Sequence, residues 1–346
     1  MSTNVVTLTR HLYEEGEKLG ADLSRLLLQI GYASKILARE IGRAALAGNL
    51  GLMGETNATG DNQKKLDVYS NEIVVDALAE TGLVAAIVSE ELELVKELAT
   101  DAGYLICMDP LDGSSNTDIN GSIGTIFGIY RRQASGASKK NGKPAPGAMT
   151  SEMLLRGSDQ VVSGYVMYGT STMLVYTAGH GVHGFTLDRD LGEFLLSHPN
   201  ITCPARGHYY SANLGHYYEW SAGVQNYVEH MEEKDKATNR PYSLRYTGAL
   251  VADVHRSLIE GGLYFYPPDA GHPTGKLRLL YECAPLGFLL ENAGGSASTG
   301  SQRILDIKAE SIHQRCPLVI GSKEDVALYE KFVAESGDKA GAKTSK

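Results

Sequence analysis

Cysteine is scarce in this chain, with four residues among 346. They lie far apart and form no Cys-x-x-Cys pair, which argues against zinc and against a disulfide framework. Long apolar runs are also missing: no segment approaches the ~20 residues of a membrane span. The N-terminus lacks the apolar stretch of a signal peptide. We therefore expect a reduced, cytoplasmic protein with no membrane partner.

An excess of basic charge is absent as well. The formal net charge is -9 at pH 7, and no cluster of Lys and Arg would follow a nucleic-acid backbone, so no nucleic-acid partner is expected. The apolar fraction of 42% and the charged fraction of 21% are typical of a globular chain. Its length suffices for about two domains. An acidic enzyme for an anionic substrate must place metal ions or single basic side chains at its site.

The periodicity of apolar residues predicts both helices and strands. Helices are expected over about residues 23–41, with Asp22 as the cap, and 65–81, separated by a glycine-rich loop over 48–60. Short apolar runs then predict strands, followed by a hairpin and a domain junction. Further helices and strands follow in the second half, which indicates a layered α+β architecture. The strands are predicted at 85–89, 104–108, 125–132, 161–169, 263–267 and 316–322, the hairpin at 181–199, the junction near 197–207, and the later helices at 248–260, 279–292 and 323–335.

Two of the predicted strands run into acidic residues. The first is followed by Glu90 and Glu91, and the second by Asp109 and Asp112. If these strands lie side by side, four carboxylates converge at one sheet edge and repel one another unless cations neutralise them. Without a nearby His or Cys, such a set favours Mg²⁺ or Mn²⁺ over zinc.

A phosphate-binding sequence follows directly. Gly113 permits close approach of the backbone, and Ser114 and Ser115 add hydroxyls and N–H groups that suit an anion. Each short motif alone is ordinary turn or loop material. Together with the second acid-tipped strand, the string predicts metal-assisted displacement at phosphorus.

The string DPLDGSSN at 109–116, followed by GTIFGIYRR, resembles the signature of class I fructose-1,6-bisphosphatases. The wider superfamily of lithium-sensitive, Mg²⁺-dependent phosphatases shares only the shorter Asp-Pro-x-Asp-Gly-Ser/Thr core. Other segments resemble the family in the same order, so that the similarity covers nearly all of residues 5–335. They are GDNQKKLDV, VSEE, GYVMYGTSTMLVYTAGHGVH, NRPYSLRYTG, ADVHRSLIEGG and GKLRLLYEC.

The resemblance implies an α/β/α/β/α sugar-phosphatase fold and a homotetramer. It implies an N-terminal, AMP-type regulatory domain over 1–198 with most metal ligands, a C-terminal sugar-phosphate-binding domain over 199–336, and a disordered tail over 337–346. The implied reaction is hydrolysis of the 1-phosphate of fructose 1,6-bisphosphate with two or more Mg²⁺ ions per subunit, Mn²⁺ being possible. Action on sedoheptulose 1,7-bisphosphate, alone or as a second substrate, is the alternative. A sugar-phosphate sensor without activity and an inositol monophosphatase are less favoured, because the metal carboxylates and a second phosphate site are all present.

The resemblance also assigns roles to individual residues. At the metal centre it implies that the ligands are Glu90, Asp109, Asp112, Glu282 and the carbonyl of Leu111. Asp67 and Glu91 match acids that activate water, Asp61 matches a loop acid that engages the centre, and Arg278 matches an arginine paired with active-site acids. Gly113, Ser114 and Ser115 match the 1-phosphate cradle. Asn213, Tyr246 and Tyr266 match residues that hydrogen-bond the 6-phosphate, and Arg245 matches an arginine that reaches in from the neighbouring subunit. Lys276 matches a residue that contacts the sugar phosphate and its hydroxyls.

Two places depart from the family pattern. His216 stands where the family often has tyrosine, which bears on substrate affinity and its dependence on pH. Gly103 stands where AMP-sensitive members have a lysine, so weak inhibition by AMP is expected. The stretch that would bind AMP comprises Ala21, Asp22, Leu23 and Ser24, together with Tyr104 and Arg131. The other histidines considered are expected to be structural or at the surface: His180, His183, His255, His272 and His313.

Overall fold

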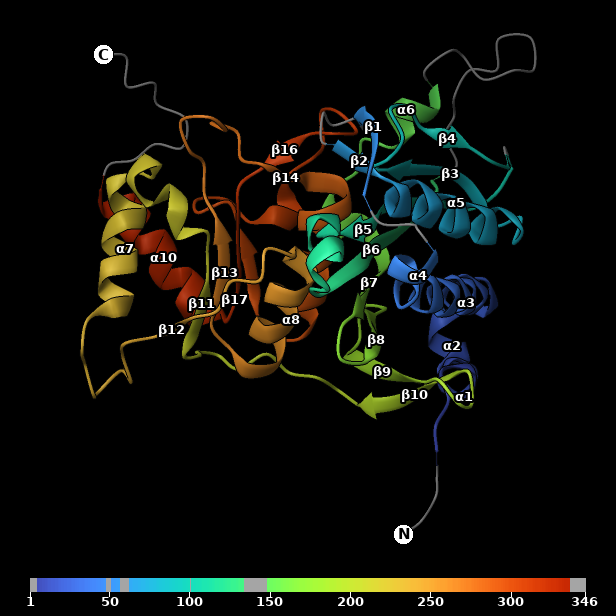
Figure 1. Cartoon of the computed structure of the whole chain (residues 1–346), viewed down its shortest axis with the longest axis horizontal. Coiled ribbons are helices and arrows are strands. Elements are labelled where there is room, and N and C mark those ends of the chain that lie inside the picture. Colours follow the sequence, from blue (N-terminus) through green and yellow to red (C-terminus); the bar gives the residue numbers. More distant parts are fainter. Residues whose placement is uncertain (1–4, 48–50, 57–61, 100, 134–147, 337–346) are drawn as a thin grey trace.

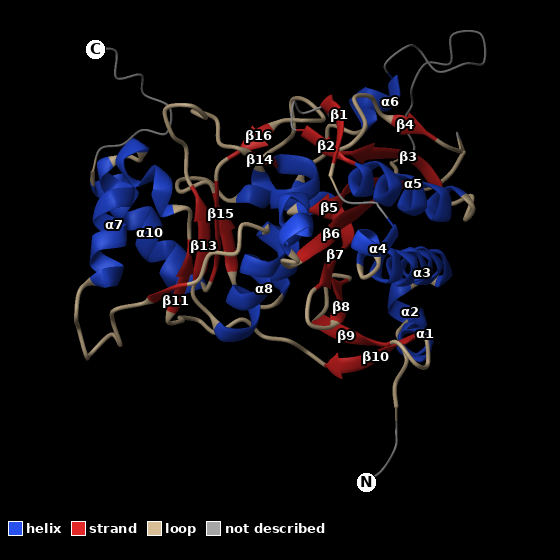
Figure 2. Cartoon of the chain, viewed as in Figure 1, coloured by secondary structure: helices blue, strands red, loops and turns tan. Residues whose placement is uncertain are grey.

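The protein is described from a computed structural model that covers residues 5–47, 51–56, 62–99, 101–133 and 148–336. It has five layers in the order helices, sheet, helices, sheet, helices (Figures 1 and 2). This is the α/β/α/β/α arrangement that the resemblance implies. Asp61 and the predicted tail at 337–346 lie outside the described residues.

The first sheet has eight strands in the order β10-β9-β8-β7-β6-β5-β3-β4. Only β3 and β5 are parallel neighbours in it; its other pairs are antiparallel. The predicted hairpin is confirmed as β9 and β10. The strands are β3 (Val84–Ser89), β4 (Lys96–Glu97), β5 (Tyr104–Asp112), β6 (Ile123–Arg131), β7 (Gln160–Tyr168), β8 (Thr172–Thr177), β9 (Val182–Asp188) and β10 (Glu193–His198).

Both faces of the first sheet are buried, because alternate residues of each strand point to opposite faces. On β5, Ile106 packs with α3 (Ala21–Ile41) and α5 (Lys65–Ala79), whereas Cys107 packs with α8 (Leu250–Glu260) and α9 (Ala284–Asn292). This explains why β5 reads as a continuous apolar run. The N-terminal helices on the first face are completed by α1 (Leu8–Glu14), α2 (Gly16–Leu19) and α4 (Ala44–Ala47).

The second sheet has five strands in the order β12-β11-β13-β17-β15. One face packs on the central layer of helices, and the other packs on α7 (Ala222–Glu232) and α10 (Lys323–Glu335) through an aromatic core that includes Tyr227 and Phe265. The strands are β11 (Tyr209–Ser211), β12 (Ser243–Leu244), β13 (Leu263–Tyr266), β15 (Ser296–Ser298) and β17 (Leu318–Gly321). Smaller elements are α6 (Ala148–Glu152), β14 (Leu277–Arg278) and β16 (Arg315–Cys316).

Three local predictions need correction. Asp22 is not the cap of α3: Gly20, with φ 85°, precedes the helix, and Asp22 lies in its first turn. The expected loop over 48–60 contains a strand, because β1 (Leu52–Thr56) pairs antiparallel with β2 (Asn62–Lys64). The helix expected over 279–292 begins with a π-helical turn, Leu279–Cys283, before α9.

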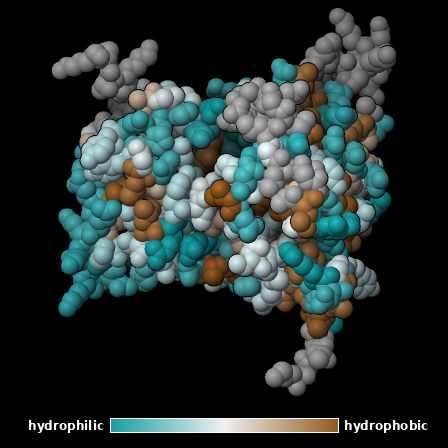
Figure 3. Space-filling view, viewed as in Figure 1, coloured by the Kyte–Doolittle hydropathy of each residue, from teal (hydrophilic) through white to brown (hydrophobic). Residues whose placement is uncertain are grey.

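In the part of the chain that the structure covers, no helix is long and apolar enough to cross a bilayer. On the face drawn in Figure 3, apolar residues form separate patches among polar ones.

Candidate active site

Two acid-tipped strands lie side by side, as the sequence suggested. In the parallel pair, Ser89 of β3 is in register with Met108 of β5, so both strands end at the same edge of the sheet. The N–H of Glu90 donates to the carbonyl of Met108 at 3.2 Å. Asp109 and Asp112 therefore meet at this edge, and the Glu90 carboxylate is near enough to raise the pKa of Asp109. Among the described residues, the group of ligand atoms within 4.8 Å of one another includes neither Glu90 nor Glu91, so the expected convergence of all four acids is not shown.

Asp109, Asp112 and Glu282 form the carboxylate cluster. Each offers a carboxylate oxygen, and these atoms lie within 4.8 Å of one another. The three residues are only 2%, 6% and 8% exposed. Glu282 reaches the cluster from the π-helical turn, and it accepts a hydrogen bond from the backbone N–H of Arg278. A residue far along the chain thus completes a site begun by β5.

Backbone donors fix the two aspartates. Asp109 accepts from the N–H of Leu111 at 2.9 Å, across the turn that Pro110 stiffens. Asp112 accepts from the N–H groups of Val251 at 2.7 Å and Leu250 at 3.3 Å. These are the first residues of α8, where unpaired N–H groups and the helix dipole stabilise a negative charge.

The carboxylate cluster is electrostatically strained without a cation. Burial raises the pKa of Asp112 to about 7, even though the N–H groups of Val251 and Leu250 act in the other direction. Burial raises the pKa of Asp109 and of Glu282 well above the usual range, and the neighbouring Glu90 and Asp112 carboxylates add to it. Buried carboxylates that repel one another, with only oxygen donors, fit hard divalent cations.

The cradle after β5 is built on Gly113. Its φ is 73°, and a Cβ there would lie 2.5 Å from the Cβ of Ala249, so a side chain is excluded. Ser114 begins a 3₁₀ turn, Ser114–Ile119, and Ser115 is exposed. Asn116, which the sequence analysis did not single out, ties this turn to the second half of the chain, because its amide donates to the carbonyl of Thr247 at 3.1 Å.

Asp67 lies beside this cradle, in the first turn of α5. It is buried, accepts from the N–H of Lys64 at 2.7 Å, and is hydrogen-bonded to the side chain of Ser114. Burial raises its pKa. The ammonium of Lys64, also missed by sequence reasoning, reaches Asp118 at 2.7 Å and so holds the 3₁₀ turn against the start of α5. The motif KKLD could have drawn attention to it.

The basic residues differ in burial. Arg278 is 5% exposed and donates to the carbonyl of His313 at 3.2 Å. Its charge lowers the pKa of Glu282, although burial outweighs it. Lys276 is exposed, and its ammonium lies 5.9 Å from the ring centre of Tyr266. Glu91, expected to activate water, directly follows Glu90, and its N–H donates to the hydroxyl of Ser89 at 3.4 Å.

The expected sugar-phosphate end is more open. Tyr246 is 39% exposed, whereas Tyr266 is buried at the end of β13. Burial raises the pKa of Tyr246 to about 12, with smaller contributions from Tyr266, Asp253 and Asp112. Asn213 caps the 3₁₀ turn Leu214–Glu219 by accepting from the N–H of Gly215 at 3.2 Å.

Arg245 is exposed and directed along the surface of its own chain. Its guanidinium donates to the carbonyl of Leu244 at 2.8 Å and lies 5.6 Å from the ring centre of Tyr209. Arg256 lies over the same ring, also at 5.6 Å.

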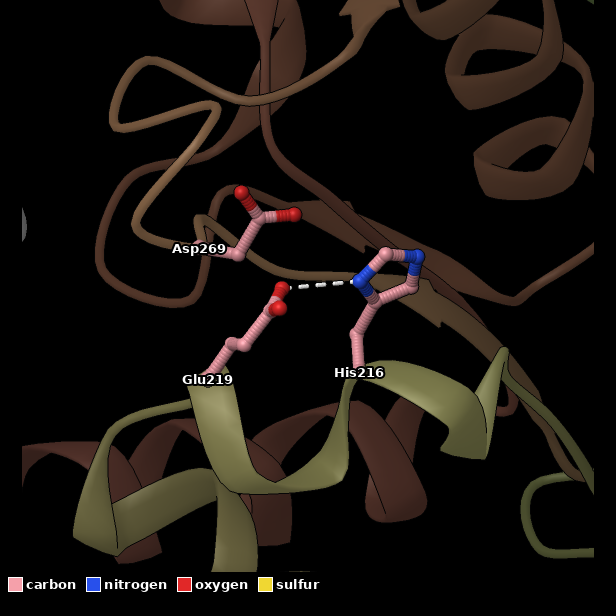
Figure 4. A group of neighbouring side chains, drawn as sticks. All are labelled: His216, Glu219 and Asp269. Atoms are coloured by element: carbon pink, nitrogen blue, oxygen red, sulfur yellow. Dashed lines mark hydrogen bonds and ion pairs between the residues drawn. The ribbon is translucent and has the colours of Figure 1, made fainter.

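A second group with metal-ligand atoms lies at this end (Figure 4). Nδ1 of His216 is 2.8 Å from a carboxylate oxygen of Glu219, and both approach Asp269 within 4.8 Å. Tyr266 is close by: burial raises its pKa, and Asp269 and Glu219 raise it further. His216, which stands where the family often has tyrosine, therefore lies beside two carboxylates, those of Glu219 and Asp269. No sequence signal connects Asp269 with His216, because they lie in separate segments.

The expected AMP-binding residues also come together. Ala21, Asp22, Leu23 and Ser24 form the start of α3, and the Ser24 hydroxyl donates to the carbonyl of Gly20 at 3.0 Å. The guanidinium of Arg131 lies 5.5 Å from the ring centre of Tyr104. Burial raises the pKa of Tyr104, and Asp22 is among the charges that act on it, so the helix start faces the β5–β6 pair.

Three buried carboxylates at one sheet edge, directly followed by a glycine and two serines, are an arrangement typical of metal-dependent phosphatases. Two family models match the chain, the fructose-1-6-bisphosphatase N-terminal domain over residues 6–199 and the C-terminal domain over residues 203–334. The chain belongs to the class I fructose-1,6-bisphosphatase family. Membership implies a divalent metal cofactor and a sugar bisphosphate substrate, fructose 1,6-bisphosphate.

Individual relatives agree along the whole length. A class 1 fructose-1,6-bisphosphatase of Acaryochloris marina is 57% identical over 333 residues, which is 95% of this chain and 97% of the relative. One of Chlorobium chlorochromatii is 48% identical over 95% of this chain and 98% of its own. The holo form of the Leishmania major enzyme has a TM-score of 0.89 at 39% identity, covering 96% of this chain and 99% of its own. Its apo form scores 0.83 at 36% identity.

Proposed function

We propose that the protein hydrolyses the 1-phosphate of D-fructose 1,6-bisphosphate, giving fructose 6-phosphate and phosphate. The observation that carries the proposal is the convergence of Asp109, Asp112 and Glu282 within 4.8 Å, directly beside the cradle that begins at Gly113. Family membership supplies the substrate class. Gluconeogenesis in the cytoplasm is the setting in which we expect this reaction.

The carboxylate cluster, with Glu90 and the carbonyl of Leu111, would hold two or more divalent ions, which we propose are Mg²⁺, with Mn²⁺ as the alternative. When bound, such ions neutralise the cluster, polarise the phosphoryl oxygens and activate water. The raised pKa values of Asp109, Asp112 and Glu282 support this assignment, because carboxylates that are buried together are costly to keep charged unless cations neutralise them.

The residues of the chain would then orient and move protons. Ser114 and Ser115 would hold the 1-phosphate, and Asp67 and Glu91 would take up the proton of the attacking water. A buried carboxylate with a raised pKa, as at Asp67, is a better proton acceptor near neutral pH than an exposed one. Arg278 would offset charge on the phosphoryl oxygens. The role of Asp61 rests on the resemblance alone.

The distal phosphate would be bound by Asn213, Tyr246, Tyr266 and Lys276, with Arg245 supplied by a neighbouring subunit of a homotetramer. The exposed position of Arg245, over Tyr209 instead of within the carboxylate cluster, supports a role across an interface. We propose that the chain divides into a regulatory half over residues 1–198 and a substrate-binding half over residues 199–336, as the resemblance implies.

A second candidate is hydrolysis of sedoheptulose 1,7-bisphosphate, alone or in addition. The group formed by His216, Glu219 and Asp269 supports this second candidate. These side chains alter the charge at the distal end of the site, where the two substrates differ. Residues at the carboxylate cluster would serve both reactions.

AMP is proposed as a weak inhibitor that binds at the start of α3. Gly103 provides no charge for the AMP phosphate, and a missing charge-assisted hydrogen bond typically costs ~1.5–3 kcal/mol, or roughly ten- to a hundred-fold in affinity. A Cβ at Gly103 would meet nothing within 4 Å, so Gly103→Lys is sterically acceptable. The variant should be inhibited at lower AMP concentrations than the parent. Strong inhibition of the parent at low micromolar AMP, unchanged in the variant, would contradict the idea.

Phosphate release from a substrate panel tests the proposed function. Fructose 1,6-bisphosphate, sedoheptulose 1,7-bisphosphate and inositol monophosphate are compared with and without Mg²⁺. We expect Mg²⁺-dependent release from the first, and comparable release from the second would identify dual specificity. Activity on inositol monophosphate alone, or none on any substrate with Mg²⁺ or Mn²⁺, would refute the proposal.

A further inference from the structure

Three histidines and a glutamate line a small cavity between the N-terminal helices and the first sheet. His11 lies on α1 and Glu15 at the junction of α1 and α2, whereas His180 lies in the turn between β8 and β9, and His183 on β9. The cavity measures ≈ 10 Å³, about the room of one water-sized particle. The elements meet because the segment before α1 pairs with β10, where the N–H of Leu196 donates to the carbonyl of Val6 at 2.8 Å.

The four side chains form two close pairs. The rings of His11 and His183 have their centres 4.7 Å apart. Nε2 of His180 is 3.3 Å from a carboxylate oxygen of Glu15. None of these residues belongs to the carboxylate cluster or to the expected AMP-binding stretch. The sequence analysis expected structural or surface roles for His180 and His183, and it did not connect them with His11.

His11 has an unmet bonding requirement. It is 7% exposed, and its Nε2 is fully buried with no hydrogen-bond partner among the described residues. Buried polar atoms in proteins are nearly always paired, so an orphaned imidazole nitrogen at a cavity wall indicates a ligand.

His183 also has bonding capacity toward the cavity. Its Nδ1 accepts a long hydrogen bond from the N–H of Asn200 at 3.4 Å, and this weak bond would give way when Nε2 binds an ion and the ring proton moves to Nδ1. Its Nε2 faces Gly181, where an added Cβ would come within 3.2 Å of that nitrogen. Gly181 has φ 82° and itself lines the cavity, so the space beside the imidazole is kept open.

We propose that this cavity binds one transition-metal ion of the Zn²⁺, Co²⁺ or Ni²⁺ type, with His11, His180, His183 and Glu15 as donors. Imidazole suits these ions, and three imidazoles with one carboxylate complete a tetrahedral set. Mg²⁺ prefers oxygen ligands and would remain at the carboxylate cluster. The scarcity of cysteine excludes cysteine-based zinc sites and does not bear on a site built from histidines.

Binding requires His180 and Glu15 to turn toward the cavity, because in the described part of the chain no three of these four residues have ligand atoms within 4.8 Å of one another. The side chain of His180 is 40% exposed and that of Glu15 is 27% exposed, so both can turn toward the cavity. The Glu15 carboxylate lies 3.2 Å from the ammonium of the exposed Lys18, and it would leave this partner to bind the ion. Burial lowers the pKa of His11 and of His183, consistent with the neutral form that donates a lone pair. The ion would clamp α1 and α2 to β9, and α2 leads directly into α3.

The test uses the full chain with Asp112→Asn and Glu282→Gln, which disable the carboxylate cluster. Zn²⁺ is titrated in competition with a chromophoric chelator, and the visible spectrum of the Co²⁺ form reports its geometry. His180→Ala/His183→Ala is added to this parent. The control, His198→Ala/His208→Ala, removes two exposed histidines outside the cavity. A third variant, His216→Ala, shows whether any of the bound Zn²⁺ is held by the group of His216, Glu219 and Asp269.

We expect the parent to bind one Zn²⁺ per chain that the His180/His183 variant binds at least about ten-fold more weakly, since even outer-shell changes cost that much. The same variant should lose the intense Co²⁺ band of a tetrahedral site. The control and His216→Ala should keep both. Circular dichroism and thermal unfolding without metal verify that each variant is folded. Equal Zn²⁺ stoichiometry and affinity in the parent and the His180/His183 variant, or a parent with no such site at micromolar Zn²⁺, would overturn the proposal.

Discussion

The two ends of the active site are built in opposite ways. At the metal end, Asp109, Asp112 and Glu282 are at most 8% exposed and are held by backbone N–H groups. At the sugar-phosphate end, Arg245 and Lys276 are exposed and rest on aromatic rings. Chemistry at phosphorus needs fixed charges in a dry site, whereas recognition of a distal phosphate can be assembled from flexible side chains and a second subunit.

This difference has a consequence for stability. Buried like charges without a cation destabilise the folded protein, and the exposed end carries little such cost. The metal end should therefore be sensitive to single substitutions and to pH, whereas the sugar-phosphate end should respond mainly in affinity.

The largest effect is expected for Asp112→Asn. The asparagine side-chain oxygen can still accept the hydrogen bond from the N–H of Val251, so the fold should persist. The substitution removes a negative charge from the carboxylate cluster, so nearly all turnover should disappear. Phosphate release under saturating substrate measures it, with Asp76→Asn on the exposed face of α5 as control. A variant retaining more than about a tenth of the parent rate, a loss under ~1.4 kcal/mol, would show that Asp112 is not a ligand.

Arg245→Ala should raise KM by roughly ten- to a hundred-fold, the effect of losing ~1.5–3 kcal/mol of charge-assisted hydrogen bonding, with kcat little changed. Arg256→Ala is the matched control, because Arg256 lies over the same Tyr209 ring at the same distance of 5.6 Å.

Subunit exchange separates a shared site from a site within one chain. Hybrids of Arg245→Ala and Asp112→Asn subunits should regain some high-affinity activity, because some sites then combine an intact arginine with intact metal ligands. Unchanged activity after verified exchange would exclude a shared site.

A smaller, few-fold effect is expected for His216→Tyr. The substitution removes the imidazole and its 2.8 Å contact with the Glu219 carboxylate, and it places the phenol that the family often has at this position. The KM of the variant for fructose 1,6-bisphosphate should therefore differ from that of the parent, and Glu219→Gln should change the KM as well. Equal KM values for the parent and both variants would separate His216 from substrate binding.

The smallest expected effect is on thermal stability. The pKa values of Asp109, Asp112 and Glu282 are raised in the folded state, so the folded protein holds these protons more tightly than the unfolded chain. Stability of the metal-free protein should therefore fall as pH rises toward and through about 7, the value for Asp112. Mg²⁺ should raise the unfolding midpoint by more at pH 8 than at pH 6, by about 1–2 °C per kcal/mol gained. An equal shift at both values would contradict the raised pKa values.

The metal end was largely predictable from sequence, because strand ends in β3 and β5 place their acids by simple geometry. Gly113 could be predicted from the turn it must form. Glu282 was identified only by resemblance, since its approach depends on a π-helical turn that apolar periodicity cannot distinguish from an α-helix. The cap at Gly20 was missed because Asp22 is the more common capping residue type, and β1 because glycine-rich segments usually signal loops.

Contacts between distant segments were out of reach. Asn116 meets Thr247, and His216 meets Asp269, through packing of the two halves that no local pattern encodes. The same holds for His11 and His183, which the pairing of the N-terminal segment with β10 brings together. Local chemistry predicts which residues can act, and the tertiary arrangement decides which of them act together.

The most direct test of the central claim is to identify the product of fructose 1,6-bisphosphate hydrolysis, by phosphorus NMR, in the parent and in Glu282→Gln. If the carboxylate cluster performs the chemistry and the Tyr266–Lys276 end only binds substrate, the parent should release the 1-phosphate in the presence of Mg²⁺. Fructose 6-phosphate should then be the sole sugar product. Glu282→Gln should leave the substrate essentially intact. Formation of fructose 1-phosphate, or undiminished hydrolysis by Glu282→Gln, would contradict the account.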